Sequence, residues 1–140
     1  MLILPDTSCW IEFFRPGGDP AIRTQLLNWL GADSLAICGP VRAEILRGAR
    51  QAEAPQITDA LAGLPYLKSE DSDWSTVEQK ARSLAGDGHQ VPLLDLLIAA
   101  LACRHGVVLA HKDIHFQTIA RVLPVCLHGF LDPFHPAEVP

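Results

Sequence analysis

The stretch MLILPDTSCWIEFF, Met1 to Phe14, decides the fold because it places an aspartate between a short apolar run and a helical pattern. The run Leu2–Leu4 is typical of a buried strand, and the pattern from Ser8 to Phe14 predicts a helix. Asp6 lies where the strand ends. A carboxylate in that position either caps the helix that follows or belongs to a site at the end of the strand.

The alternation of strand and helix continues along the chain. Apolar runs rich in β-type residues predict four strands, at Leu2–Leu4, Leu35–Cys38, Val107–Ala110 and Val125–Leu127. Helical patterns fill the gaps, at Ser8–Phe14, Ala21–Leu30, from Pro40 onward, and at Gln56–Leu61, Asp71–Leu84, Pro92–Arg104 and Ile114–Arg121. Such alternation predicts a parallel sheet covered by helices on both faces, with ligands at the carboxyl ends of the strands.

Length and composition predict one compact domain over residues 1–140, with an irregular tail at 131–140 that contains three prolines. Hydrophobic residues make up 49% of the chain and charged residues 19%, which is typical of a globular protein. The first apolar run is too short for a signal peptide, and no apolar stretch reaches membrane-spanning length. We therefore expect a cytoplasmic protein that does not contact a membrane.

The charge balance limits how this chain could bind nucleic acid. The net charge of −5 excludes binding through bulk positive charge, so such a role needs a local group of bases or bound metal ions. The cysteines are scattered singly in apolar segments, at Cys9, Cys38, Cys103 and Cys126. Without a close pair they predict small buried hydrophobic residues rather than a metal or redox motif.

The segment PLLDLLIAALA, Pro92 to Ala102, is apolar except for Asp95. A helix that is apolar on nearly every side is buried on most of its faces. An ionised carboxylate is costly to bury, so Asp95 has to be paired, protonated or bound to a cation. The alternative is that Asp95, in the first turn, caps the helix or interacts favourably with the helix dipole.

Two further acids also have two interpretations each. Glu44, in GPVRAEILRGA, either lies beside the apolar face of its helix or forms a surface pair with Arg47. Asp113 lies between a β-type run and a helix, as Asp6 does, so it either caps that helix or shares a site with Asp6.

These four carboxylates would repel one another if the fold brought them together. A hard divalent cation removes the repulsion, and all-oxygen ligands suit Mg²⁺ or Mn²⁺. The chemistry that such a site favours is metal-assisted hydrolysis of a phosphodiester.

Four motifs together resemble the PIN-domain ribonucleases and, within them, the VapC-type toxins of bacterial toxin–antitoxin pairs. The motifs are PDTSCWIEFFR (5–15), PVRAEILRGAR (40–50), VPLLDLLIAALACRHG (91–106) and LAHKDIHFQTIA (109–120). The resemblance covers essentially the whole chain. It implies a single PIN domain, a three-layer α/β/α sandwich whose central parallel sheet has about four to five strands.

The resemblance also implies a Mg²⁺- or Mn²⁺-dependent endoribonuclease. Its acidic metal ligands, which are also the catalytic residues, would be Asp6, Glu44, Asp95 and Asp113. Thr7 or Ser8 would support the first of these acids. Many relatives carry another acid two positions after the fourth one, where this chain has His115. That histidine either binds or orients the phosphate or only begins a helix.

The partners that the resemblance implies are an RNA substrate, a second copy of the chain in a homodimer, and a small VapB-type antitoxin. The C-terminal segment of the antitoxin would lie across the acidic groove. The aromatic residues Trp10, Phe13 and Phe14 either line that groove or pack in the core.

Two other functions compete with this one. A phosphatase with a nucleophilic strand-end aspartate usually has a second acid two residues later, where this chain has Ser8. A trapped aspartyl-phosphate on Asp6 would favour it. A non-catalytic PIN-fold RNA-binding module would bind RNA equally well with and without Mg²⁺ and would never cut it.

Overall fold

The computed structural model of the chain describes residues 1–130, and the expected irregular tail at 131–140 lies outside the described residues. Three parallel strands form one sheet in the order β1 (Ile3–Pro5), β4 (Val108–His111) and β5 (Cys126–Gly129). Two more, β2 (Ile37–Cys38) and β3 (Tyr66–Leu67), form a parallel pair.

A parallel bridge between Ile3 and Leu35 joins the two sheets. The backbone N–H of Ile3 donates to the carbonyl oxygen of Ser34, and the N–H of Ala36 donates to the carbonyl oxygen of Ile3. The five strands therefore lie side by side in the order β3, β2, β1, β4, β5. This confirms the expected parallel sheet of about four to five strands.

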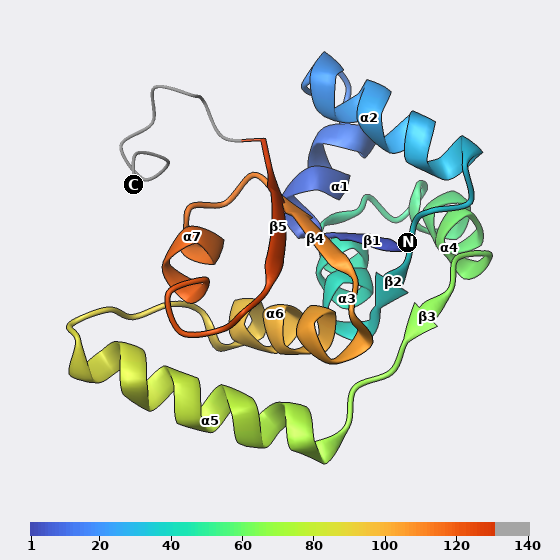
Figure 1. Cartoon of the computed structure of the whole chain (residues 1–140). Helices are drawn as coiled ribbons and strands as arrows, with labels where there is room; N and C mark the ends of the chain where they lie inside the picture. Colours follow the sequence, from blue (N-terminus) through green and yellow to red (C-terminus); the bar gives the residue numbers. More distant parts are fainter. Residues whose placement is uncertain (131–140) are drawn as a thin grey trace.

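Seven helices connect these strands within the described residues: α1 (Thr7–Phe14), α2 (Pro20–Gly31), α3 (Gly39–Gly48), α4 (Ala54–Ala62), α5 (Asp71–Gly86), α6 (Leu93–His105) and α7 (His115–Ile119). Figure 1 shows α1 and α2 on one side of the sheet and α5 and α6 on the other. The fold is therefore the three-layer α/β/α sandwich that the sequence predicts.

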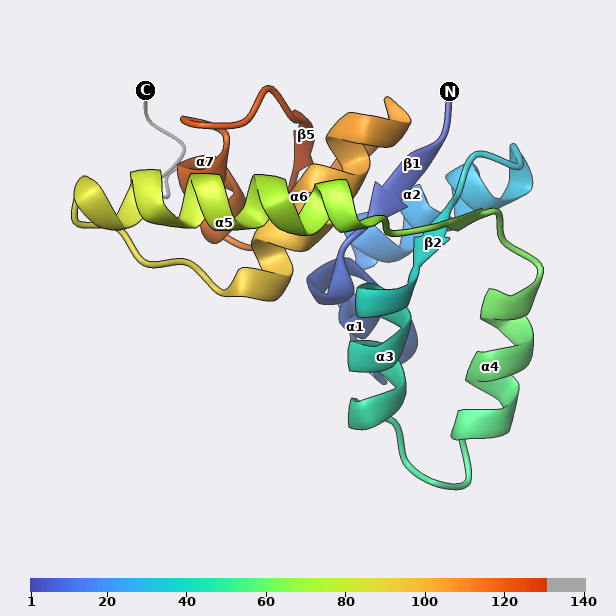
Figure 2. The same ribbon diagram turned by 90° about the horizontal axis from the view of Figure 1, so that it is seen from below.

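Helix α6 forms the centre of the core. Every residue from Leu96 to Ala102 is buried, because the helix packs against α5, α3, α7 and strand β4. Gly106 ends the helix with a positive φ of 65°, a conformation that glycine adopts without steric cost. The prediction of a helix buried on most of its faces is confirmed. Figure 1 shows α6 between α5 and the strands, and in Figure 2 α5 crosses in front of α6.

Two expectations are wrong. Strand β3 is missing from the four predicted strands because it has only two residues, between Pro65 and Lys68, and its Tyr66 is exposed. Cys126 is exposed rather than buried, because it begins β5, the strand at one edge of the sheet. Cys103 is half-buried, whereas Cys9 and Cys38 are fully buried as predicted.

Among the described residues, no helix combines the length and the apolar character that crossing a membrane requires.

Candidate metal centre

Asp6 follows strand β1 and lies at the start of α1, where its carboxylate is almost completely buried. The backbone N–H of Cys9 and the hydroxyl of Ser8 donate to Oδ1 of Asp6, at 3.3 and 2.6 Å. Burial nevertheless raises the pKa of Asp6 from 3.8 to about 7. Asp6 is thus a helix cap, as one interpretation predicted, and also a carboxylate whose charged form is poorly stabilised.

The two hydroxyl residues after Asp6 tie α1 to neighbouring elements. Thr7 Oγ1 donates to Oε1 of Glu44 on α3 at 2.8 Å. The hydroxyl of Ser8 accepts from the backbone N–H of Lys112 at 3.0 Å, just beyond the end of β4. Of the two hydroxyls, Ser8 therefore contacts Asp6, the acid that it was expected to support, whereas Thr7 contacts Glu44.

Asp95 lies in the first turn of α6, and its side chain is 15% exposed. Burial, together with the nearby charges of Asp113 and Glu44, raises the pKa of Asp95 from 3.8 to about 6. His115 opposes this shift, with its Nδ1 at 3.2 Å from Oδ2 of Asp95. The helix has no side-chain cap, so Asp95 does not cap it, but its carboxylate lies in the first turn, where it interacts favourably with the helix dipole.

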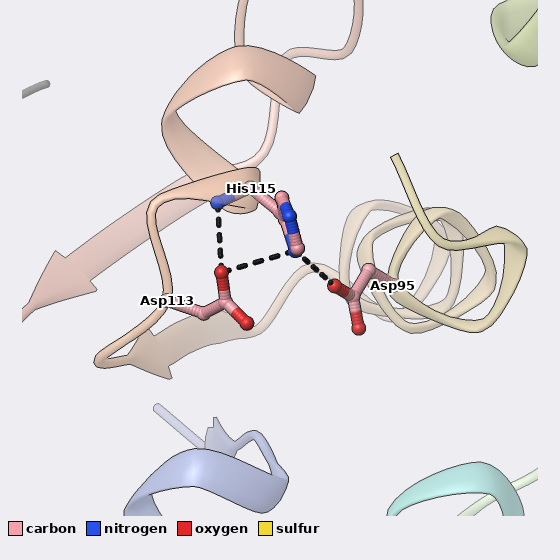
Figure 3. Close-up of side chains that lie close together, drawn as sticks. All are labelled: Asp95, Asp113 and His115. Atoms are coloured by element: carbon pink, nitrogen blue, oxygen red, sulfur yellow. Dashed lines mark hydrogen bonds and ion pairs between the residues drawn. The ribbon is translucent and has the colours of Figure 1, made fainter. Parts of the chain in front are cut away.

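Asp113 follows strand β4 and holds the start of α7. Its Oδ1 accepts the backbone N–H of His115 at 2.9 Å and lies 3.1 Å from the imidazole Nδ1 of the same residue. Figure 3 shows the His115 ring between the carboxylates of Asp113 and Asp95. From the sequence, His115 either binds the phosphate or only begins a helix. It does begin α7, and its ring also contacts both acids.

The structure brings the predicted acids together to different degrees. Asp95, Asp113 and His115 each offer a ligand atom within 4.8 Å of the others, and within residues 1–130 they are the group compact enough to share one cation. Asp6 and Glu44 lie outside that compact group. The charge of Asp95 nevertheless raises the pKa of Asp6, and the charge of Glu44 raises the pKa of Asp95, so the four acids form one electrostatic cluster.

Glu44 is half-buried on α3 and accepts the hydroxyl of Thr7. The alternative surface pair with Arg47 does not form among the described ion pairs. Glu44 therefore faces α1 and the acidic cluster rather than a basic residue on its own helix.

The donor set fits a hard divalent cation. The groups are carboxylate oxygens with one imidazole nitrogen beside them, and the ion pairs of Asp95 and Asp113 within the described residues are both made with His115. Two of the carboxylates have raised pKa values because burial and mutual repulsion are not balanced by Lys or Arg. A cation with oxygen ligands would supply the missing positive charge.

His111 is a positioning residue that the sequence pattern did not reveal. It is fully buried in β4, and its Nδ1 lies 3.0 Å from the carbonyl oxygen of Asp113. A carbonyl only accepts, so Nδ1 carries the proton in this contact. Burial lowers the pKa of His111, which keeps the ring neutral. The sequence signal that could have indicated this role is the position of His111, at the end of a strand and two residues before Asp113.

The raised pKa values predict how the stability of the metal-free protein depends on pH. Between about pH 4 and 7 the folded state keeps protons on Asp6 and Asp95 that the unfolded chain has released, so the free energy of unfolding falls as the pH rises. Asp6→Asn removes one such proton. We therefore expect the variant to gain melting temperature over the unmodified protein as the pH rises. In EDTA, the melting temperature of the variant minus that of the unmodified protein should be at least about 5 °C larger at pH 8 than at pH 5.

The variant is compared with the unmodified protein because His111 has the opposite effect. Its lowered pKa makes stability rise with pH up to about 6.5, equally in both proteins. Differential scanning fluorimetry at pH 5 and pH 8 measures the melting temperatures of the two proteins and so the difference between them at each pH. An equal offset at pH 5 and pH 8 would show that Asp6 is ionised throughout and would contradict the prediction.

Comparison with known proteins identifies this arrangement. A family model described as PIN domain matches residues 3–122, which is most of the chain. The parallel sheet with helices on both faces is thus the fold of a PIN domain.

Relatives define the group more closely. Ribonuclease VapC11 of Mycobacterium tuberculosis is 38% identical over 125 residues, covering 86% of this chain and 93% of that protein. Ribonuclease VapC18 of the same organism is 32% identical over 127 residues, covering 87% and 90%. The chain therefore belongs to the VapC ribonucleases of the PIN domain family, which confirms the resemblance seen in the sequence.

A solved structure supports the fold. VapBC2 from Rickettsia felis, bound to a DNA fragment from the promoter, contains a chain that matches with a TM-score of 0.75 at 18% identity. The match covers 93% of this chain and 99% of that one.

Proposed function

We propose that this chain is the toxin of a VapBC-type pair and acts as a metal-dependent endoribonuclease that hydrolyses RNA phosphodiester bonds. The observation that carries the proposal is that Asp95 and Asp113 lie on either side of the His115 ring, and that both belong to one electrostatic cluster with the buried Asp6. These acids lack a balancing Lys or Arg among the described ion pairs. The ribonuclease activity named for the relatives supports the same function.

The cofactor in this proposal is Mg²⁺ or Mn²⁺, held by Asp6, Asp95, Asp113 and Glu44. A bound divalent cation would neutralise charge on the attacked phosphate and activate water. Ser8 keeps the carboxylate of Asp6 in place through its 2.6 Å hydrogen bond, and Thr7 does the same for Glu44 at 2.8 Å. His111 fixes the backbone of Asp113. The protein thus holds its ligands in position before the substrate arrives.

The partner proposed for inhibition is a VapB-type antitoxin. A groove of about 300 Å³ lies between α1, α3 and α4, with Trp10, Phe14, Ile45 and Ile57 among its walls and Glu44 at its edge. Trp10 is buried and stacks on Phe14, so these two residues serve both the core and the groove. Phe13 packs edge-on against both rings and is not among the residues that line the groove. An apolar antitoxin segment that fills this groove would end beside the acidic cluster.

The wider assignment has three parts. We propose that residues 1–140 form a single PIN domain, that two copies form a homodimer, and that the protein acts in the cytoplasm. The family match over residues 3–122 supports the first part. The absence of a membrane-spanning helix in the described residues is consistent with the last.

Cleavage of a mixed pool of structured RNA by the antitoxin-free protein tests the proposal. The assay is run with Mg²⁺, with Mn²⁺ and with EDTA. We expect cutting with a metal and none with EDTA, because the carboxylates cannot neutralise a phosphate without a cation. Asp59→Asn, which removes an exposed acid from α4, is the matched control and should cut normally. Binding of RNA without cutting in every condition would indicate a non-catalytic module instead.

A further inference from the structure

A cavity of about 700 Å³ adjoins the acidic cluster. The residues that line it belong to α5, to the loop that joins α5 to α6, to the first turns of α6 and to the start of α7. Figure 1 shows where these elements lie. His115 lines this cavity and also contacts Asp95 and Asp113, so the cavity and the candidate metal centre share one side chain. A chain whose phosphate is held by the acids would have a neighbouring unit at the mouth of this cavity.

The walls combine an apolar surface with hydrogen-bonding groups. Val91, Pro92, Leu93 and Leu96 supply the apolar part, and Leu93 is 56% exposed there without contributing to the core. His89 and Gln90 lie on the connecting loop and offer polar groups. This is the composition that binds an unstacked base, with a flat apolar contact for its face and polar partners for its edge.

The charge of the cavity differs from that of the whole chain. Arg82 on α5 lines it, and the guanidinium of Arg121 lies 3.3 Å from Nε2 of His89. Of the described residues that line the cavity, none is acidic, although the chain carries a net charge of −5. His115, at the boundary with the acids, does not repel a phosphate as a carboxylate would. The cavity is therefore complementary to a polyanion.

We infer that the cavity binds one nucleotide of single-stranded RNA, next to the phosphodiester that the acidic cluster cuts. The base lies against the apolar wall of α6, Gln90 and His89 contact its edge, and Arg82 contacts a flanking phosphate. The volume lies within the range of sites that enclose small organic ligands. This inference rests on the proposed function for its cleavage step, and it names residues that select the RNA sequence.

The binding experiment uses the full-length protein in EDTA, where metal-dependent cleavage does not occur. A random-sequence single-stranded hexaribonucleotide pool is titrated into ¹⁵N-labelled protein, and amide shifts are recorded. We expect the largest shifts at the loop between α5 and α6 and at the first turn of α6. A mixture of the four nucleoside monophosphates is titrated in parallel, and we expect smaller shifts because it lacks the neighbouring phosphates.

Two substitutions locate the contact. Arg82→Ala and Gln90→Ala change exposed residues of the cavity, so folding is not affected. Each should reduce the affinity for the hexamer pool about 5-fold. Arg23→Ala removes the same charge from an exposed position on α2, away from the cavity, and should leave the affinity within about 2-fold.

Cleavage with Mg²⁺ by the same proteins separates the two proposals. If the unmodified protein cuts RNA, Arg82→Ala should raise KM about 5-fold with kcat nearly unchanged, because the arginine contacts the substrate away from the reacting atoms. Cavity shifts without any cleavage would overturn the proposed function and leave the RNA site standing. Hexamer binding that leaves the cavity amides unmoved, equal effects of Arg82→Ala and Arg23→Ala, or equally strong binding of the mononucleotides would overturn the inference.

Discussion

Asp95→Asn is expected to reduce metal-dependent RNA cleavage by at least about 100-fold while the protein remains folded. Asp95 is the acid that interacts with all the others, since it contacts His115 beside Asp113 and its charge acts on Asp6. Asparagine keeps the shape but lacks the charge that a divalent cation needs. Loss of a group that only orients a metal ligand already costs about 10- to 100-fold, so loss of the ligand itself should cost more.

Stability should change in the opposite direction. Burial and the neighbouring acids raise the pKa of Asp95 to about 6, so at pH 8 its charge destabilises the metal-free protein. We expect the variant to melt at the same temperature as the unmodified protein in EDTA, or higher, and to lose the stabilisation that added Mn²⁺ gives.

Cleavage rates, melting curves and Mn²⁺ calorimetry are measured on Asp95→Asn beside the exposed-site control Asp59→Asn. Asp6→Asn should behave like Asp95→Asn in all three assays. A clear fall of the metal-free melting temperature in both site variants would make these acids structural residues. Undiminished cleavage by Asp95→Asn would show that Asp95 does not belong to the catalytic site.

The sequence predicted the acidic cluster because the reasons for each acid are local. Asp6 and Asp113 follow strands whose carboxyl ends meet at one edge of a parallel sheet, so their proximity follows from the topology. Asp95 interrupts an apolar helix, and burying that helix also removes most of its acid from solvent. The periods of strand and helix are enough to predict both features.

The remaining features of the site depend on contacts between distant parts of the chain. The contact of His115 with Asp95 joins residues 20 positions apart, and the cavity is formed by α5, α6 and a loop whose path the sequence does not determine. Strand β3 was missed because two residues carry no periodicity, and it exists only because Ile37 and Cys38 lie beside it. Tertiary contacts decide such elements, not local propensity.

The same limit hid the contact that holds α5 on α6. Arg104, at the end of α6, donates from Nε and Nη2 to the two carboxylate oxygens of Asp73 at 2.8 and 2.9 Å. The buried Asp73 also accepts the backbone N–H of Glu70, and Arg104 donates to the carbonyl oxygen of Lys68. In the sequence, Arg104 is only one more base near a helix end.

Arg104→Met is expected to lower the free energy of unfolding by about 3 kcal/mol, because it leaves the buried carboxylate of Asp73 without its cation. Asn in place of Asp73 still accepts the N–H of Glu70 but carries no charge. The double variant Arg104→Met/Asp73→Asn should therefore regain more than half of the loss. Urea unfolding of both variants and of Asp73→Asn completes the cycle.

The pH dependence of the free energy of unfolding shows whether the charge of Arg104 causes the loss of stability in Arg104→Met. The Arg104 guanidinium holds the pKa of Asp73 below its usual value, so the pair stabilises the protein above about pH 4 and loses this contribution as the pH falls through the lowered pKa. The difference between Arg104→Met and the unmodified protein should thus be full at pH 7 and much smaller near pH 3. A difference that stays constant would mean that Arg104 acts through the packing of its aliphatic stem, and the absence of rescue in the double variant would mean the same.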